Sequence, residues 1–351
     1  MVFKFNNIDI KAIYSTTPVN ELKFSELSSH FGINRINKIT KLTGINSVRV
    51  SSENTTASDL CIFSATKLLD DLDIERKSIG GVIFVSQTSD YKLPQTSNLI
   101  QYKLGLPNDI VCFDLPLGCS GYINGLLQAS MILNSSSCQN VLVLAGDTTT
   151  KMINPLDGAN RFVFGDAGSA TLLTKGSNSI GFKIFNDGSG YKDLIIPAGG
   201  SRLPLTKLTK TVESDGEGNF RSKEDLYMNG LNVFNFAITS VPRILKEIVE
   251  LSPFNEKDVG AFLLHQANAF IINSIRKKMQ ISNDKMPIEI DGYGNTGPSS
   301  IPLLLGLLNS KSNNLANKKN SILCGFGVGL SWGACYLNLE NTIIRKTEDN
   351  G

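Results

Sequence analysis

Two stretches of this chain resemble each other, and this internal repeat limits the possible folds more than any other feature of the sequence. The run Ile79-Gly-Gly-Val-Ile-Phe-Val-Ser resembles Val259-Gly-Ala-Phe-Leu-Leu-His-Gln, which begins 180 residues later. Asn140-Val-Leu-Val-Leu resembles Asn320-Ser-Ile-Leu-Cys at the same offset. Matches that keep both their order and their spacing favour duplication of one unit over chance. We therefore expect two copies of one folding unit.

Each copy is expected to combine buried strands with amphipathic helices. Short apolar runs suit strands that are buried on both faces, and they occupy residues 81–85, 141–145, 170–173, 261–264 and 321–324. Longer stretches with helical apolar spacing occupy residues 57–71, 233–249 and 269–279. Strands that alternate with helices predict a mainly parallel, layered α/β architecture.

The boundary between the two halves is expected near Lys175-Gly-Ser-Asn-Ser, which gives residues 1–178 and residues 179–351. The polar stretch from Gly199 to Lys223 is rich in serine, threonine, lysine and glycine. Such a composition predicts a long loop within the second half.

Length and charge exclude several classes of protein. A chain of 351 residues, 41% of them hydrophobic, can bury a large core. Its 34 basic residues nearly balance its 32 acidic residues, so no global field favours nucleic acid or an anionic membrane. The first fifteen residues lack the apolar core of a signal peptide, and no run reaches transmembrane length. We expect a cytoplasmic protein.

The cysteines and histidines argue against a metal site. The six cysteines form no C-x-x-C pair and only two histidines are present, so neither zinc binding nor a disulfide framework is indicated. Reduced thiols are the simpler interpretation. His30 is expected at the surface or at a helix cap.

The first candidate site surrounds Cys119 in Phe113-Asp-Leu-Pro-Leu-Gly-Cys-Ser-Gly-Tyr. A cysteine at a turn from strand to helix lies near helix amides that favour the thiolate, the form that attacks acyl groups. Gly118 and Gly121 allow the backbone to approach a ligand closely. The alternative is a buried structural cysteine in a tight turn.

The second candidate is Leu264-His-Gln-Ala-Asn-Ala, in which His265 ends an apolar run and Asn268 follows. Polar residues that close a buried strand are typical of a site at the strand's carboxyl end. A hydrogen-bonded core histidine is the alternative.

Two glycine-rich segments complete the set of candidates. Asp291-Gly-Tyr-Gly-Asn-Thr-Gly-Pro-Ser-Ser presents Asn295 before a helix expected near Pro302, and a helix cap is its alternative role. Gly325-Phe-Gly-Val-Gly-Leu-Ser-Trp-Gly exposes backbone amides that could bind an oxyanion. The phosphate motif G-x-x-x-x-G-K-[ST] is absent, which argues against a nucleotide site.

Together these four segments resemble the β-ketoacyl-acyl-carrier-protein synthase III family. The resemblance runs from Thr43-Gly-Ile to Trp332-Gly-Ala and includes Ser86-Gln-Thr-Ser-Asp-Tyr, Phe164-Gly-Asp-Ala-Gly-Ser-Ala and Met228-Asn-Gly-Leu-Asn-Val-Phe. It implies a thiolase-like fold, with two duplicated α/β halves in a layered αβαβα arrangement. It also implies a homodimer.

The resemblance assigns the chemistry to three residues. Cys119 corresponds to the family's acyl-carrying nucleophile, and His265 and Asn295 to the pair that stabilises the enolate after a malonyl thioester loses carbon dioxide. The backbone amides of Cys119 and Val328 correspond to the oxyanion hole. No permanently bound cofactor is implied, since the substrates are thioesters of coenzyme A or of a carrier protein.

Substrate and partner contacts follow from the same resemblance. Phe164 corresponds to an aromatic residue of the substrate channel, with core packing as its alternative role. Asn268 is expected near the substrate, and Leu93 is expected to reach the partner subunit's acyl pocket. The basic cluster, defined as Arg276, Lys277 and Lys278, is expected to dock an acidic carrier protein. The alternative is a solvated helix end, where basic residues are favoured.

Some of the family's positions are changed in this chain. The tryptophan and arginine that hold the adenine of coenzyme A align with Lys38 and Leu42, and a second arginine aligns with Gly158. Phe270 replaces an arginine near the basic cluster. Nearby arginines that could substitute for the adenine contacts are Arg35, Arg49 and Arg161.

Three functions remain for comparison. The first is a decarboxylating condensation of an acyl primer with a malonyl thioester. The second is transfer of the acyl group to an amine or a hydroxyl, and the retention of Asn295 favours condensation over it. A non-catalytic partner subunit is the third, but such subunits lack the nucleophilic cysteine.

Overall fold

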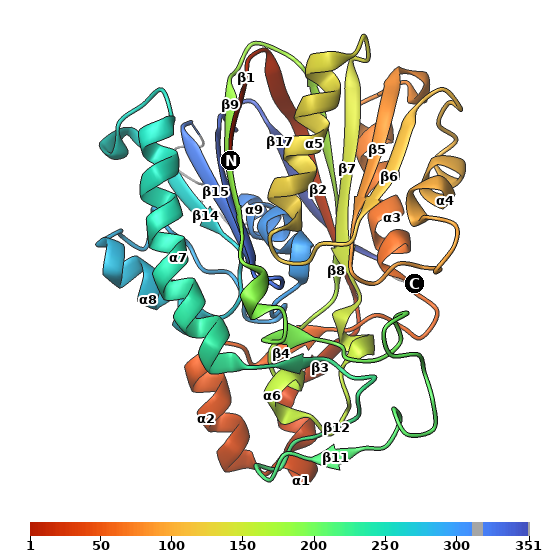
Figure 1. Ribbon diagram of the computed structural model, residues 1–351. Coiled ribbons are helices and arrows are strands. Elements are labelled where there is room, and N and C mark those ends of the chain that lie inside the picture. Colours follow the sequence, from red (N-terminus) through yellow and green to blue (C-terminus); the bar gives the residue numbers. More distant parts are fainter. Residues whose placement is uncertain (311–318, 350–351) are drawn as a thin grey trace.

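The computed structural model describes residues 1–310 and 319–349 and consists of two large β-sheets between layers of helices (Figure 1). The six-stranded sheet has the order β17-β2-β8-β7-β5-β6. Its strands are β2 (Ile8–Pro18), β5 (Ile79–Val85), β6 (Val111–Leu115), β7 (Asn140–Asp147), β8 (Ala167–Lys175) and β17 (Ile343–Asp349).

The five-stranded sheet has the order β1-β9-β16-β15-β14. Its strands are β1 (Val2–Phe5), β9 (Ile180–Asn186), β14 (Ala261–Leu264), β15 (Ser321–Gly327) and β16 (Ser331–Leu337). Strands β9-β16-β15-β14 repeat the directions of β2-β8-β7-β5, because in both series only the last pair is parallel. The sheets therefore show the duplication that the repeated runs predict.

The expectation of mainly parallel sheets is met only in part: three of the five pairings in the six-stranded sheet are parallel, but only one of the four in the five-stranded sheet. In each series the first two pairings are antiparallel. Strands β15 and β16 are joined by the short glycine-rich turn at residues 328–330, and a connection this short can only reverse the chain. The apolar runs predicted the strands correctly, but strands buried on both faces have the same composition in either direction.

Helices form three layers around the two sheets (Figure 1). The middle layer consists of α5 (Gly121–Ser135) and α9 (Ser300–Ser310), whose apolar side chains join both sheets in one core. The outer layers cover the six-stranded sheet with α3 (Ala57–Asp71) and α4 (Thr96–Lys103), and the five-stranded sheet with α7 (Gly230–Leu251) and α8 (Ala269–Met279). The order is αβαβα, as expected.

Local chemistry fixes several of these elements. A capping box between Thr56 and Asp59 starts α3. Helix α5 packs closely on the sheet at Gly125, where an added Cβ would lie 2.8 Å from Val143 Cγ1. This close packing holds the beginning of α5, and the turn before it, against the carboxyl ends of the strands.

Each end of the chain joins the sheet that is built mainly from the other half. Strand β1 lies in the five-stranded sheet and β17 in the six-stranded sheet. The boundary at residue 178 stays a prediction. Among the described residues, no helix combines the length and the apolar character that crossing a bilayer requires.

Smaller elements lie at one end of the two sheets, at the bottom of Figure 1. The helices are α1 (Ser28–Phe31), α2 (Ile33–Thr43) and α6 (Gly158–Arg161), and the strands are β3 (Glu21–Lys23), β4 (Ser47–Arg49), β10 (Leu194–Ile195), β11 (Glu213–Ser214), β12 (Phe220–Arg221) and β13 (Tyr227–Met228). Single 3₁₀ turns occupy 24–27, 76–78, 149–152, 188–190, 256–258 and 297–299. The segment expected as a long loop carries the β11–β12 hairpin.

Candidate active site

Cys119 lies in the turn between β6 and the first residue of α5. Its side chain is buried, with 6% of its surface exposed. Gly121 brings the start of the helix onto the sheet, since an added Cβ there would lie 2.5 Å from Val85 Cγ1. The thiol is thus held beside the amino end of a helix, the placement that its sequence motif predicts.

Burial and a nearby charge shift the pKa of the Cys119 thiol in one direction, and hydrogen bonds shift it in the other. Burial raises its pKa to about 12, and the nearby carboxyl of Asp147 also raises it. Hydrogen bonds from the backbone of Cys119 itself and from the side chain of Asn295 lower the pKa. The resting form is therefore the neutral thiol, with two donors in place to stabilise negative charge on sulfur.

His265 directly follows β14 and is fully enclosed, with 1% of its surface exposed. Its backbone amide donates to the carbonyl of Cys324 at 2.8 Å. Its Nδ1 lies 2.6 Å from the Oγ of Ser300 at the start of α9. Burial lowers the pKa of His265 to about 3, so its imidazole is neutral near pH 7.

Asn295 is held by its backbone so that its side chain faces the thiol. Its amide donates to Val163 at 2.8 Å, and its carbonyl accepts from Gly165 at 3.1 Å. The side-chain oxygen accepts from the amide of Gly297 at 3.0 Å, which leaves the NH₂ group for Cys119. The helix after it begins at Ser300, two residues before the expected Pro302.

The glycine-rich turn after β15 packs directly on the cysteine. An added Cβ on Gly327 would lie 2.8 Å from Cys119 Cβ, and an added Cβ on Gly118 would lie 3.0 Å from Val328 Cγ1. The Oγ atoms of Ser120 and Ser331 are 2.6 Å apart. Only glycine at position 327 allows this approach, which brings the backbone of residues 327–328 beside the thiol.

A cavity of about 270 Å³ opens at the thiol. Its lining is largely apolar, with a few polar side chains near the cysteine, and comprises Gln87, Cys119, Asp147, Thr149, Met152, Phe164, Leu194, Ile195, Ile196, Leu226, Gly297 and Val328. Phe164 lines the cavity and also packs in a small core with Ile153 and Val163, and its role toward a substrate stays a prediction. The shape and lining suit an acyl chain.

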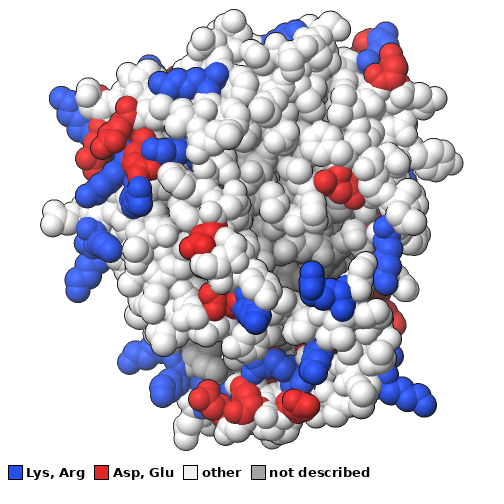
Figure 2. All heavy atoms as spheres, viewed as in Figure 1, with Lys and Arg blue, Asp and Glu red and all other residues white. Residues whose placement is uncertain are grey.

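A larger cavity of about 600 Å³ lies at the far ends of α7 and α8 and includes none of these residues. Its lining includes no cysteine or histidine, so the smaller cavity is the candidate site. On the face shown in Figure 2, uncharged side chains fill the upper centre, and charged side chains gather on the left side and along the bottom.

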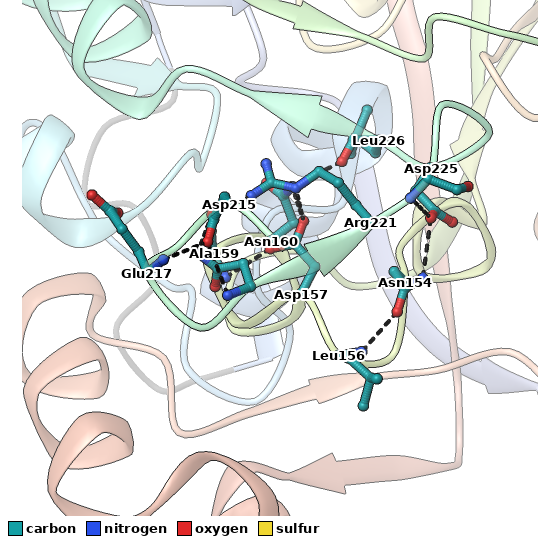
Figure 3. A network of polar contacts seen from close by, with 12 residues as sticks. Asn154, Leu156, Asp157, Ala159, Asn160, Asp215, Glu217, Arg221, Asp225 and Leu226 are labelled. Carbon is teal, nitrogen blue, oxygen red and sulfur yellow. Dashed lines mark hydrogen bonds and ion pairs between the residues drawn. The ribbon is translucent and has the colours of Figure 1, made fainter. Parts of the chain in front are cut away.

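A polar network supports one wall of the cavity (Figure 3). Asn160 Nδ2 donates to the carbonyl of Leu226 at 3.0 Å and to Asp157 Oδ2 at 2.8 Å. Arg221 contacts the same Asp157 oxygen at 3.4 Å and Asp215 Oδ2 at 2.6 Å. Helix α6 thus anchors the segment that carries Leu226 into the cavity.

Other predicted contact residues lie outside this cavity. Asn268 accepts from the amide of Ile271 at 2.8 Å and caps α8. Leu93 is 86% exposed on the loop before α4. In the basic cluster, Lys278 Nζ donates to the carbonyl of Ile238 at 2.9 Å and Arg276 hydrogen-bonds Asn273, while the cluster forms the last turn of α8. Their roles toward substrate, partner subunit and carrier stay predictions.

Sequence reasoning missed Asp147, Ser300 and Leu226. Asp147 ends a buried strand, so the rule that singled out His265 also applies to Ala-Gly-Asp at residues 145–147. Ser300 and Leu226 carry no comparable signal, because only the folded chain brings them to the imidazole and to the cavity.

Comparisons with known proteins agree with this geometry. Residues 113–188 match the family model described as 3-oxoacyl-[acyl-carrier-protein (ACP)] synthase III, and residues 249–339 match its C-terminal counterpart. A Campylobacter jejuni protein is 34% identical, covering 99% of this chain and 98% of its own. The β-ketoacyl-[acyl-carrier-protein] synthase III of Caldanaerobacter subterraneus subsp. tengcongensis is 33% identical, covering 85% and 88%.

Solved structures give the same picture. The 3-oxoacyl-(acyl-carrier protein) synthase of Burkholderia xenovorans LB400 is 32% identical and superimposes with a TM-score of 0.90, covering 99% of each chain. The similarity therefore extends over the whole αβαβα arrangement.

Proposed function

The chain belongs to the 3-oxoacyl-[acyl-carrier-protein] synthase III family, also called β-ketoacyl synthase III, and from this membership we propose how its residues carry out the condensation. It is an acyl-transferring condensing enzyme. The observation that carries the assignment of residues is the contact between the Asn295 side chain and the Cys119 thiol, because it joins motifs from the two halves of the chain in one site.

In the first step, Cys119 attacks the carbonyl of an acyl thioester. A C–S bond forms to the cysteine, and the carrier leaves as a thiol that takes up the proton lost by Cys119. Backbone amides of Cys119 and Val328 would bind the tetrahedral oxyanion, which the close packing of residues 327–328 on the cysteine supports. The acyl chain would occupy the apolar part of the cavity.

In the second step, a malonyl thioester loses carbon dioxide. His265 and Asn295 would hydrogen-bond the oxygen of the resulting enolate, whose carbon attacks the acyl-cysteine and releases the 3-oxoacyl product. Neutral His265 suits this role, because burial keeps its imidazole uncharged until negative charge develops nearby.

We propose an acyl carrier protein as the main primer donor. Lys38 and Leu42 are exposed on α2 and offer no stacking ring. The space that a side chain at Gly158 would need is filled, because an added Cβ would lie 2.9 Å from the Phe31 ring and 3.1 Å from Arg35 Nη2. These contacts support loss of the family's adenine site.

Two of the three arginines offered as substitutes are already engaged by other groups of the chain. Arg35 donates to Gly218 at 3.1 Å and to Asn219 Oδ1 at 2.5 Å. Arg49 donates to the carbonyl of Val19 at 2.8 Å. Arg161 is half-buried, and burial lowers its pKa. The basic cluster on α8 supplies positive charge for docking an acidic carrier.

We also propose a homodimer. Strand β6 forms an edge of the six-stranded sheet, and its first residue Val111 is 45% exposed. An apolar edge strand of this kind is suited to pairing with a second copy. Leu93, on the loop before α4, would then reach the partner's acyl pocket. A cytoplasmic location stays a prediction.

The test is intact-protein mass spectrometry after incubation with matched acyl-carrier-protein and acyl-coenzyme A donors, run beside release of labelled carbon dioxide from malonyl carrier protein. The proposal expects an acyl mass shift on Cys119, faster from the carrier protein, and carbon dioxide release by the acylated enzyme. Acylation without carbon dioxide release, with consumption of an amine or alcohol, would instead identify the acyltransferase alternative.

A further inference from the structure

Asp147 is a second ionisable group inside the cavity of Cys119, and the condensation steps above do not use it. It is the last residue of β7, at the carboxyl end of a strand buried in the six-stranded sheet. Only 1% of its surface is exposed, and it lines the cavity together with Cys119 and Gly297.

The two oxygens of the Asp147 carboxyl have different surroundings. Oδ1 accepts from Ser86 Oγ at 2.8 Å, from the Gln87 amide at 2.7 Å, and from the Thr88 amide and Oγ1 at 3.2 and 3.1 Å. No hydrogen bond between described residues reaches Oδ2. The loop after β5 therefore saturates one oxygen and leaves the other without a protein donor.

Asp147 Oδ2 lies in the space beside Gly297 that a side chain at this position would fill. A Cβ added to Gly297 would lie 2.8 Å from Oδ2, so any larger residue at this position would press on it. Gly297 also borders the cavity. A proton on Asp147 would thus reside on Oδ2, beside the Gly297 backbone that borders the cavity.

Few ionisable groups surround this carboxyl. Its negative charge raises the pKa of Cys119, and it raises the pKa of Cys61, which is fully buried on α3. The loop after β5 and the turn at Gly297 contribute only uncharged groups. Burial raises the pKa of Asp147 to about 7 against the effect of its hydrogen bonds, and no basic side chain is among its main influences.

Two negative charges in one buried cavity repel each other strongly, because little water is present to screen them. We propose that Asp147 and Cys119 act as a coupled pair that carries a single negative charge, so that Asp147 sets the pH above which the nucleophile stops gaining reactivity. Asp147 acts through Cys119 and is a positioning residue for the acylation step.

The coupling has a specific consequence for pH dependence. Below the pH at which Asp147 ionises, each rise of one pH unit increases the thiolate fraction of Cys119 tenfold. Above it, the thiolate can form only when the proton moves to Asp147 Oδ2, and this exchange within the pair does not depend on pH. The reactivity of Cys119 should therefore level off near pH 7 instead of rising toward the high pKa of the thiol.

The test is the rate at which the neutral reagent iodoacetamide alkylates Cys119, measured from pH 5.5 to 8.5. Peptide mass spectrometry separates this cysteine from Cys112 and Cys138, the two partly exposed thiols. Between pH 7.0 and 8.5 we expect the wild-type rate to change less than about threefold, and the rate of Asp147→Asn to rise about thirtyfold. The amide keeps an oxygen for the loop donors and removes only the charge.

Ser86→Ala provides a second variant that keeps the carboxyl. It removes one donor to Oδ1, so the ionised form is less stable and the level part of the profile should begin at higher pH. Equal slopes for wild type and Asp147→Asn above pH 7, or an unchanged profile in Ser86→Ala, would overturn the proposal. The importance of this coupled pair for catalysis rests on the proposed function. Alkylation measures the thiolate directly, so the coupling can be tested even if the proposed function fails.

Discussion

The Nδ1 atom of His265 lies 2.6 Å from the Oγ of Ser300, in a buried contact between the end of β14 and the start of α9. The contact fixes the orientation of the imidazole ring, because the backbone of His265 is already held by Cys324. Ser300 is therefore a positioning residue for the group proposed to stabilise the enolate.

Replacing Ser300 with alanine should lower carbon dioxide release from malonyl carrier protein by about tenfold, since one hydrogen bond that orients the imidazole is lost. Acylation of Cys119 should continue at nearly the wild-type rate. Ser299→Ala is a matched control, because the neighbouring Ser299 Oγ is buried without a hydrogen-bond partner in the described chain. Equal losses in both variants would point to general damage to the fold.

Cys119→Ser should abolish formation of the acyl-enzyme while the protein remains folded. A serine hydroxyl without a strong base is a much poorer nucleophile than a thiol. Mass spectrometry after incubation with an acyl donor measures the result, and Cys112→Ser, which lies on β6 outside the cavity, is the control. An acyl mass shift on the Cys119→Ser variant would show that the nucleophile is another residue.

Asn295→Ala should reduce carbon dioxide release by roughly a hundredfold or more, as does loss of an oxyanion donor in other enzymes. Acylation should decline less, since the variant loses only one of two donors to the thiol. The control Asn229→Ala removes the cap of α7 and should cost about 1 kcal/mol of stability while preserving chemistry. Comparable defects in both half-reactions of Asn295→Ala would argue against a separate role in decarboxylation.

The stability of the fold should report the burial of Asp147. In the unfolded chain this carboxyl loses its proton near its ordinary pKa of 3.8, but in the folded chain only near pH 7. Between these values the folded state binds more protons, so wild-type stability should fall as pH rises, by up to about 1.4 kcal/mol per unit. Urea unfolding measures the free energy of unfolding of both proteins. The value for Asp147→Asn minus that for wild type should increase from pH 4 to 7 and stay constant above pH 7. A difference independent of pH contradicts this.

The homodimer predicts a mass in light scattering twice that of the chain at micromolar concentration. Val111→Lys places a charge on the edge strand β6 and should weaken the assembly. Val2→Lys, on the exposed strand β1 of the other sheet, is the control. A monomer in the wild type would remove the basis for Leu93 acting across subunits.

The sequence by itself determined the elements and their duplication. The apolar run 261–264 and the amphipathic stretches 57–71 and 269–279 coincide with β14, α3 and α8, because burial and helical spacing are local properties of the chain. The motifs around Cys119, His265 and Asn295 also stood out locally, although the residues alone left structural roles open for each, and their resemblance to a family gave them a common purpose.

Only the tertiary structure decided the directions of the strands and the neighbours of the nucleophile. A strand buried on both faces has the same composition whether its partner is parallel or antiparallel, so the mixed sheets could not be derived from apolar runs. Asp147 and Ser300 lie 28 and 35 residues from Cys119 and His265 in the sequence. Their effects on the thiol and the imidazole arise from distances and burial, which exist only after the two halves pack together around α5 and α9.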